Sequence, residues 1–136
     1  MIVDTSVWIE YLQNTGSEAD ELLAAAIDVD DAITIPEVVR MELLIGPTDE
    51  ERAKERRRFL DGFDVVALEP LIDAEEAAAI HRRCRRAGET PRNLIDCMIA
   101  AVAIRRDEQV LHRDRDFDVI ARHTTLQVVS ALGGTG

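Results

Sequence analysis

The chain has 136 residues, of which 46% are apolar and only four are proline. This length matches one domain with one continuous core, and no run approaches the roughly 18 uninterrupted apolar residues of a membrane helix. The net charge of −11, from 27 acidic and 16 basic residues, argues against a protein that grips a phosphate backbone by its overall charge. We expect a single soluble domain, 1–132, and a disordered tail, 133–136.

Short β-branched runs alternate with longer helical patterns along the chain. The runs predict strands at 2–3, 33–35, 65–68, 110–111 and 126–129. The patterns predict helices at 5–13, 17–28, 37–45, 49–61, 74–87, 91–106 and 116–122. Strands that alternate with helices in this way are typical of parallel βαβ units, so the predicted class is α/β.

Polar residues and glycines mark where the predicted helices begin and end. Ser17, Thr48 and Asp73 are each followed three positions later by an acidic residue, which is the spacing of a capping box. Three glycines stand where a left-handed residue would close a helix, namely Gly46, Gly62 and Gly88.

The N-terminal segment lacks the basic flank and the apolar stretch of a secretory signal, so a cytoplasmic location is expected. Cys84 and Cys97 have no metal-ligand spacing, and a core of this size gains little from a disulfide in a reducing compartment. Both are predicted to be free thiols.

Two aspartates close predicted strands. Asp4 ends the first strand, and Asp114 follows the strand at 110–111. Open α/β sheets bind ligands at the carboxyl edge of their strands, so both side chains are expected at such an edge. Taken singly, Asp4 is equally well explained as a helix N-cap, and Asp114 as an exposed turn or cap residue.

Two further acids lie inside strongly apolar helical patterns. Glu42 has no basic residue three or four positions away, although a structural glutamate would normally sit near one. Asp96 lies in a helix that is apolar on nearly every side, close to its start. The helix dipole, with Arg92 or Asn93, offers a purely structural reason for the charge of Asp96.

The same geometry therefore recurs at four positions. A carboxylate among apolar neighbours costs several kcal/mol unless a cation compensates it. Two acids at strand ends and two on core-facing helix surfaces can converge on one crevice, where a hard cation with oxygen ligands relieves their repulsion. The simplest joint interpretation is a metal-dependent active site that holds Mg²⁺, with Mn²⁺ able to substitute.

Four segments carry these acids in order, at 1–8, 36–43, 93–101 and 112–117. Together they resemble the motifs of the PIN-domain ribonucleases, and in particular of the VapC toxins of type II toxin–antitoxin pairs, over about residues 1–129. The resemblance implies a three-layer α/β/α PIN-like fold with a central, mostly parallel sheet of about five strands. It also implies a homodimer and inhibition by a cognate VapB antitoxin, whose C-terminal segment wraps the toxin.

The resemblance also assigns roles to individual residues. It implies that the catalytic and metal-binding acids are Asp4, Glu42, Asp96 and Asp114. Asp116 would be a fifth catalytic acid, and Ser6 the hydroxyl beside the first. The expected activity is Mg²⁺-dependent endonucleolytic cleavage of RNA, in which three aspartates hold a metal that activates water. Glu42 would position the water or a second metal.

Other side chains have less specific assignments. The basic residues cluster in short runs, which are either phosphate-binding patches or solvated helix faces. Arg113 and Arg115 flank the fourth acid and are the best candidates for phosphate contacts. His112 is expected to be structural, with substrate contact as the alternative. Trp8 and Phe59 are expected in the core, with contact to the antitoxin as the alternative.

Other classes of function fit less well. A phosphoryl-transfer enzyme of the haloacid dehalogenase type needs an aspartate where this chain has Ser6. A receiver domain needs a lysine near the last strand, but the lysine of this chain is Lys54, in a predicted helix. Two alternatives stay open, namely a non-enzymatic binding module that keeps the acids for stability and a nuclease that accepts DNA.

Overall fold

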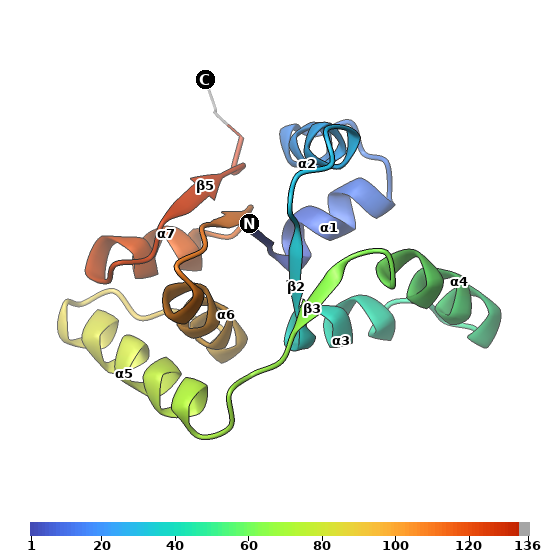
Figure 1. Cartoon of the computed structure of the whole chain (residues 1–136). Coiled ribbons are helices and arrows are strands. Elements are labelled where there is room, and N and C mark those ends of the chain that lie inside the picture. Colours follow the sequence, from blue (N-terminus) through green and yellow to red (C-terminus); the bar gives the residue numbers. More distant parts are fainter. Residues whose placement is uncertain (134–136) are drawn as a thin grey trace.

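Five short strands form one parallel sheet at the centre of the molecule (Figure 1), as seen in a computed structural model that describes residues 1–133. The strands are β1 (Ile2–Val3), β2 (Thr34–Pro36), β3 (Asp64–Val66), β4 (Val110–His112) and β5 (Val128–Ser130). Their spatial order is β3-β2-β1-β4-β5, and each pairing is parallel. The predicted α/β class and five-stranded sheet are confirmed.

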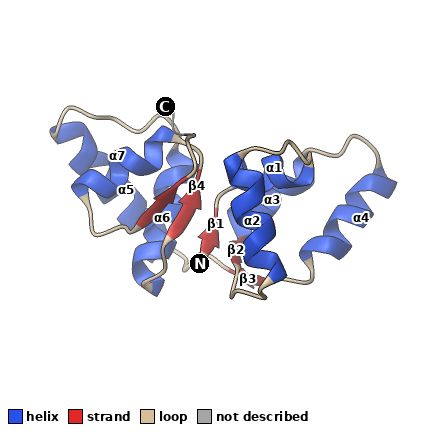
Figure 2. Cartoon of the chain, turned by 90° about the horizontal axis from the view of Figure 1, so that it is seen from above, coloured by secondary structure: helices blue, strands red, loops and turns tan. Residues whose placement is uncertain are grey.

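Within the described residues, seven helices connect the strands and cover both faces of the sheet (Figure 2). On one side lie α1 (Thr5–Leu12), α2 (Glu18–Asp28), α3 (Glu37–Ile45) and α4 (Glu50–Leu60). On the other side lie α5 (Ile72–Arg86), α6 (Leu94–Arg106) and α7 (Arg115–His123). No helix in this part of the chain has the length and apolar character needed to cross a membrane.

The strand order places a topological switch point between β1 and β4. The chain builds β2 and β3 outward on one side of β1, then crosses through α5 and α6 to place β4 on its other side. Right-handed crossovers in opposite directions put their helices on opposite faces, which leaves a crevice at the carboxyl ends of these two strands. Val3 pairs with Leu111 there, so the two strands end within one residue of each other.

The core centres on α6, which is buried on nearly every side. Cys97 and the segment 99–103 are at most 1% exposed, and they pack between the sheet and the outer helices. Small residues in this segment let neighbouring helices approach closely, which explains a helix without a polar face. Cys84 and Cys97 are both buried and free, as predicted.

Two helix starts show how far the capping pattern predicts structure. Ser17 caps α2 as predicted, because its hydroxyl accepts a hydrogen bond of 3.2 Å from the N–H of Asp20. The predicted cap at Thr48 is wrong. Asp49 caps α4 instead, and its carboxylate accepts from the N–H of Arg52 at 2.8 Å.

The predicted cap at Asp73 is also wrong, because α5 already begins at Ile72. The carboxylate of Asp73 turns inward, where it accepts from the N–H of Glu69 at 2.7 Å and pairs with Arg105. A guanidinium partner that is distant in sequence thus outcompetes the local capping role.

Only one of the three glycines predicted to close helices adopts the left-handed conformation. Gly88, with a φ of 83°, follows α5 as expected. Gly46 ends α3 with a helical φ of −61°, and Gly62 has no positive φ. The predicted disordered tail lies outside the described residues, except for Gly133.

A candidate metal centre at the carboxyl edge of the sheet

Asp4 follows β1 and caps α1, so its two predicted roles coincide. Its carboxylate accepts hydrogen bonds from the N–H of Ser6 at 3.1 Å and from the Ser6 hydroxyl at 2.6 Å. The side chain is 4% exposed. Burial is the main reason that the pKa of Asp4 rises from 3.8 to about 6, and the charge of Glu42 adds to it.

Ser6 joins the two sides of the switch point. While its hydroxyl donates to Asp4, its oxygen accepts from the N–H of Arg113 at 3.0 Å. On the neighbouring strand pair, the N–H of Asp4 donates to the carbonyl of Leu111 at 2.9 Å. The loops after β1 and β4 are therefore fixed to each other, which holds the acids that they carry in register.

Asp114 caps α7 and is held by a buried histidine. Its carboxylate accepts from the N–H of Asp116 at 2.9 Å, while its own N–H donates to Nδ1 of His112 at 3.1 Å. Because Nδ1 accepts, the neutral ring carries its proton on Nε2, which donates to Asp118 at 3.0 Å. Burial lowers the pKa of His112, and the ring is fully buried, so the alternative of substrate contact is wrong.

Asp116 is buried and holds the chain segment that leads into α6. One of its oxygens, Oδ2, accepts from the N–H of Arg92 at 2.8 Å and from the N–H of Asn93 at 3.0 Å. The interpretation that these two residues stabilise Asp96 is therefore wrong. Their main-chain donors serve Asp116, and the side chain of Asn93 caps α6 through the N–H of Ile95.

Asp96 lies in the first turn of α6 and is 4% exposed. Its Oδ2 is buried and has no hydrogen-bond partner among the described residues. Burial raises the pKa of Asp96 to about 9, reinforced by the charges of Asp4, Asp114, Asp116 and Glu42. A buried carboxylate without a donor, surrounded by other carboxylates, needs either a proton or a cation.

Three of the acids form a cluster that fits a metal ion. One oxygen each from Asp96, Asp114 and Asp116 lies within 4.8 Å of the others. Hard cations bind oxygen ligands at about 2.0 to 2.6 Å, so one ion can reach all three. The ligand atoms are all carboxylate oxygens, and Asp96 has an oxygen, Oδ2, without a hydrogen-bond partner within residues 1–133, so the donor set suits Mg²⁺ or Mn²⁺.

Asp4 and Glu42 lie beside this cluster, and both raise the pKa of Asp96 by their charge. Glu42 projects from α3, where its Oε1 accepts from the hydroxyl of Thr5 at 2.7 Å. It is half-buried rather than enclosed by apolar residues, since Ile45 on the same helix is 71% exposed. All five acids singled out in the sequence therefore gather in one region, but three of them form the tight group.

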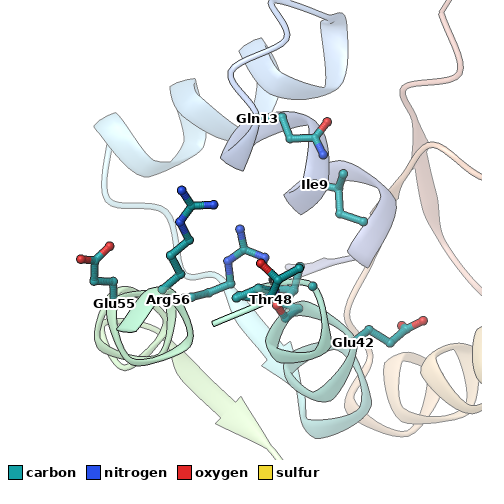
Figure 3. Close-up of a pocket in the computed structure, with 10 residues that line it drawn as sticks. Ile9, Gln13, Glu42, Thr48, Glu55 and Arg56 are labelled. Atoms are coloured by element: carbon teal, nitrogen blue, oxygen red, sulfur yellow. Dashed lines mark hydrogen bonds between the residues drawn. The ribbon is translucent and has the colours of Figure 1, made fainter. Parts of the chain in front are cut away.

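Two cavities flank the acids. The first, of about 580 Å³, lies between α1, α3 and α4 and has Glu42 in its lining (Figure 3). In this view Arg56 extends from α4 into the cavity, and the carboxylate of Glu42 is directed away from the cavity. The second cavity, of about 440 Å³, has Asp114 and Asp116 in its lining. Glu42 thus borders one cavity, and two members of the cluster border the other.

The two predicted phosphate-binding arginines both line the second cavity but differ in their partners. Arg113 forms an ion pair of 2.6 Å with Glu10, whereas Arg115 is exposed and has no ion-pair partner among the described residues. Arg92 lines the same cavity. This location could not be predicted from the sequence, because the loop before α6 carries no periodic signal.

Comparison with known proteins agrees with this geometry. The family profile of the PIN domain matches residues 1–123. The chain is 42% identical over 131 residues to Ribonuclease VapC11 of Mycobacterium tuberculosis (strain ATCC 25618 / H37Rv) and to VapC ribonuclease Mb1587 of Mycobacterium bovis, with 96% of this chain and 98% of each relative covered.

Solved structures share the fold at lower sequence identity. FitAcB from Neisseria gonorrhoeae has a TM-score of 0.75 at 18% identity and covers 98% of this chain and 99% of its own. DNA-bound VapBC from Salmonella typhimurium has a TM-score of 0.74 at 22% identity, with coverages of 95% and 96%. These two likenesses establish the three-layer fold.

Proposed function

Since this chain belongs to the PIN-domain family and is a homologue of the VapC ribonucleases, we propose that it is a Mg²⁺-dependent endoribonuclease toxin, neutralised by a cognate VapB antitoxin. The observation that carries the proposal is the group formed by Asp96, Asp114 and Asp116, in which Asp96 has a buried oxygen without a partner. Structural acids are normally paired, so this arrangement supports a metal-binding role.

In the proposed site, Asp4, Glu42, Asp96 and Asp114 bind metal, and Asp116 is a further catalytic acid. When bound by these residues, Mg²⁺ would supply Lewis-acid chemistry for hydrolysis of the phosphodiester. Glu42, steadied by Thr5, orients the attacking water or binds a second ion.

Other residues keep these acids in place. Ser6 fixes the side chain of Asp4 through two hydrogen bonds, and His112 fixes the main chain at Asp114. Asp116 holds the main chain just before α6, the helix that carries Asp96. Fixed ligands of this kind bind metal without a large loss of conformational freedom, which supports a preformed site.

Arg113 and Arg115 would contact the phosphates of the RNA substrate. Both line the cavity that also has Asp114 and Asp116 in its lining, which supports this role. The net charge of −11 does not oppose this role, because divalent ions offset the acids before any phosphate binds.

The antitoxin would dock on the side of α1, α3 and α4. Large apolar side chains are exposed there, including Ile9, Met41 and Ile45, beside the cavity of about 580 Å³. The chain would also form a homodimer, which would cover some of the apolar residues that remain exposed elsewhere, such as Leu71 and Ile72.

Cleavage assays with a matched pair of variants test the proposed function. The purified chain should cut RNA with Mg²⁺ or Mn²⁺ and lose this activity in EDTA. Asp96→Asn should reduce the cleavage rate by at least 100-fold, because it removes a charged ligand of the metal. Asp107→Asn is the control, since Asp107 ends the same helix in a left-handed conformation that asparagine accepts.

Failure of the wild-type chain to cut any RNA in the presence of metal would contradict the proposal, as would full activity of Asp96→Asn. Sequencing of RNA 5′ ends after brief expression, with Asp4→Ala as the inactive control, would identify the RNA and the cleavage motif. A single-stranded DNA of the same sequence tests whether the activity is specific for RNA.

A further inference from the structure

The cavity of about 440 Å³ beside the acidic cluster has the size and the position of a ligand site. Its walls come from the loop before α6, through Glu89, Thr90 and Arg92, and from the start of α7. Its volume falls within the range of about 300 to 1,000 Å³ that is usual for small-ligand pockets. Because Asp114 and Asp116 belong both to the cavity and to the metal group, a ligand here lies directly against the proposed reaction centre.

Two arginines that line this cavity are available to a ligand. Arg92 and Arg115 are exposed, and neither side chain forms an ion pair or a hydrogen bond within residues 1–133. Two nearby arginines are already paired, Arg113 with Glu10 and Arg122 with Glu89. A guanidinium group carries five N–H donors that fit the oxygens of a phosphate.

The remaining acid in the cavity lining does not oppose an anionic ligand. Glu89 accepts hydrogen bonds from the guanidinium of Arg122, and its Oε1 lies 3.0 Å from Nε2 of His123. The negative charge of Glu89 is therefore already matched by a cation on α7. Outside the metal group, the lining presents uncompensated positive charge.

The position of Arg92 is tied to the acidic cluster itself. Its main-chain N–H donates to Asp116 at 2.8 Å, so its side chain starts from a point fixed by one of the clustered acids. Arg115 begins α7, directly after the Asp114 cap. Both arginines therefore extend from main-chain positions that are fixed next to the acidic cluster.

We propose that this cavity is the subsite for the nucleotide next to the scissile phosphate, with Arg92 and Arg115 binding the phosphate of that nucleotide. Val119 and Leu132, which also line the cavity, offer an apolar surface to the base. This inference rests on the proposed function, and it adds Arg92 as a substrate-binding residue and separates Arg115 from the already paired Arg113.

Steady-state kinetics on a short RNA oligonucleotide test the subsite. Arg92→Gln and Arg115→Gln should each raise KM about 10-fold, leave kcat within about twofold, and weaken the dependence of KM on salt, as expected when a phosphate contact is lost. Arg58→Gln is the control, because Arg58 is also exposed but lies on α4, on the other side of the sheet. A substrate that lacks the nucleotide bound in this cavity should have a higher KM for the wild type. For Arg92→Gln, the same removal should hardly change KM.

The outcomes distinguish failure of the proposed function from failure of the proposed subsite. If the wild type and Arg58→Gln both fail to cut RNA, the proposed function is wrong. If they cut RNA and the two cavity variants match them in KM, or lose kcat alone, the subsite is wrong. Binding of Mn²⁺ without RNA, measured by calorimetry, should be the same in all four proteins, because neither arginine is a metal ligand.

Discussion

His112 and Asp114 are joined by a hydrogen bond of 3.1 Å from the main-chain N–H of the aspartate to Nδ1 of the buried imidazole. The other ring nitrogen donates to Asp118, so the ring has one fixed orientation. His112 is fully buried and cannot reach a substrate. Its contribution to the site is to set the direction in which the main chain presents Asp114.

Two substitutions separate the hydrogen bonds of His112. An asparagine at this position places its oxygen near Nδ1 and can keep the bond to Asp114, whereas a glutamine reaches toward the position of Nε2. We expect His112→Gln to raise the Mg²⁺ concentration needed for half-maximal cleavage about 10-fold or more, as is usual for groups that orient metal ligands. His112→Asn should raise it less. Equal Mg²⁺ requirements in the two variants, at similar Tm, would show that the bond to Asp114 has no role in metal binding.

The stability of the metal-free protein should fall as the pH rises. Burial raises the pKa of Asp4 to about 6 and that of Asp96 to about 9, so the folded state holds protons that the unfolded state has lost. The stabilisation from these protonated groups is complete below about pH 3.8 and is lost as the pH rises through each folded pKa. Urea unfolding in EDTA between pH 5 and 9 measures how the free energy of unfolding changes with pH.

In that experiment, the free energy of unfolding should fall less steeply with pH for Asp96→Asn than for Asp107→Asn, because Asp96→Asn removes the group with the higher pKa. The difference between the two variants should also shrink when Mn²⁺ is present, since the ion takes the place of the proton. Identical slopes in EDTA would mean that Asp96 does not titrate in the predicted range.

The ion pair between Asp73 and Arg105 should stabilise the side of the sheet that carries α5 and α6. Asp73 is 1% exposed and receives two hydrogen bonds, of 3.0 and 2.9 Å, from the guanidinium. The same partner holds the pKa of Asp73 below its usual value. We expect Arg105→Ala to reduce the free energy of unfolding by about 2 to 4 kcal/mol, less than for a fully buried pair because the arginine is partly exposed.

Arg106→Ala is the matched control for this ion pair. Arg106 is the next residue on the same helix, and it pairs with Glu108 at 2.6 Å with 41% of its own side chain exposed. Such a surface pair contributes about 0 to 1 kcal/mol. Urea unfolding at pH 7 should therefore separate the two variants clearly, and the deficit of Arg105→Ala should shrink at low pH, where Asp73 becomes protonated.

Trp8 and Phe59 should respond differently to substitution, although their rings lie 6.1 Å apart. Trp8 is fully buried, so Trp8→Ala should cost about 3 to 5 kcal/mol of stability and report on folding. Phe59 is 36% exposed, beside the proposed docking side. Phe59→Ala should weaken binding of a VapB-type antitoxin, measured by calorimetry, more than it lowers Tm. Unchanged affinity would remove Phe59 from the interface.

The sequence predicted the elements well where the signal was local. The alternation of β-branched runs with helical patterns gave each strand and helix to within a few residues, and the hydroxyl of Ser17 caps α2 as its pattern implies. Patterns failed where a distant partner intervened. Asp73 leaves its capping role for Arg105, 32 positions away, and Gly46 stays helical at the end of α3.

In the candidate site, too, local patterns were predictive and contacts between residues distant in sequence were not. Asp96 stood out because a lone acid in an apolar helix has no local explanation, and the structure leaves its Oδ2 without a partner among the described residues. The contacts of Asp116 with the main chain of Arg92 and Asn93 span more than 20 positions. No local pattern encodes them, so the place of Asp116 in the tight cluster, with Asp4 and Glu42 beside it, could not be predicted from the sequence.

The crossover that places β4 beside β1 also governs when during translation this protein could become harmful. Asp4 emerges from the ribosome first, but its main-chain partner Leu111 and the acids Asp114 and Asp116 follow only near the end of the chain. A nascent or truncated polypeptide that stops before Val110 lacks two of the clustered carboxylates and the strand β4, which pairs with β1. With the proposed function, the chain therefore cannot cleave the messenger RNA that encodes it until its own synthesis is almost complete.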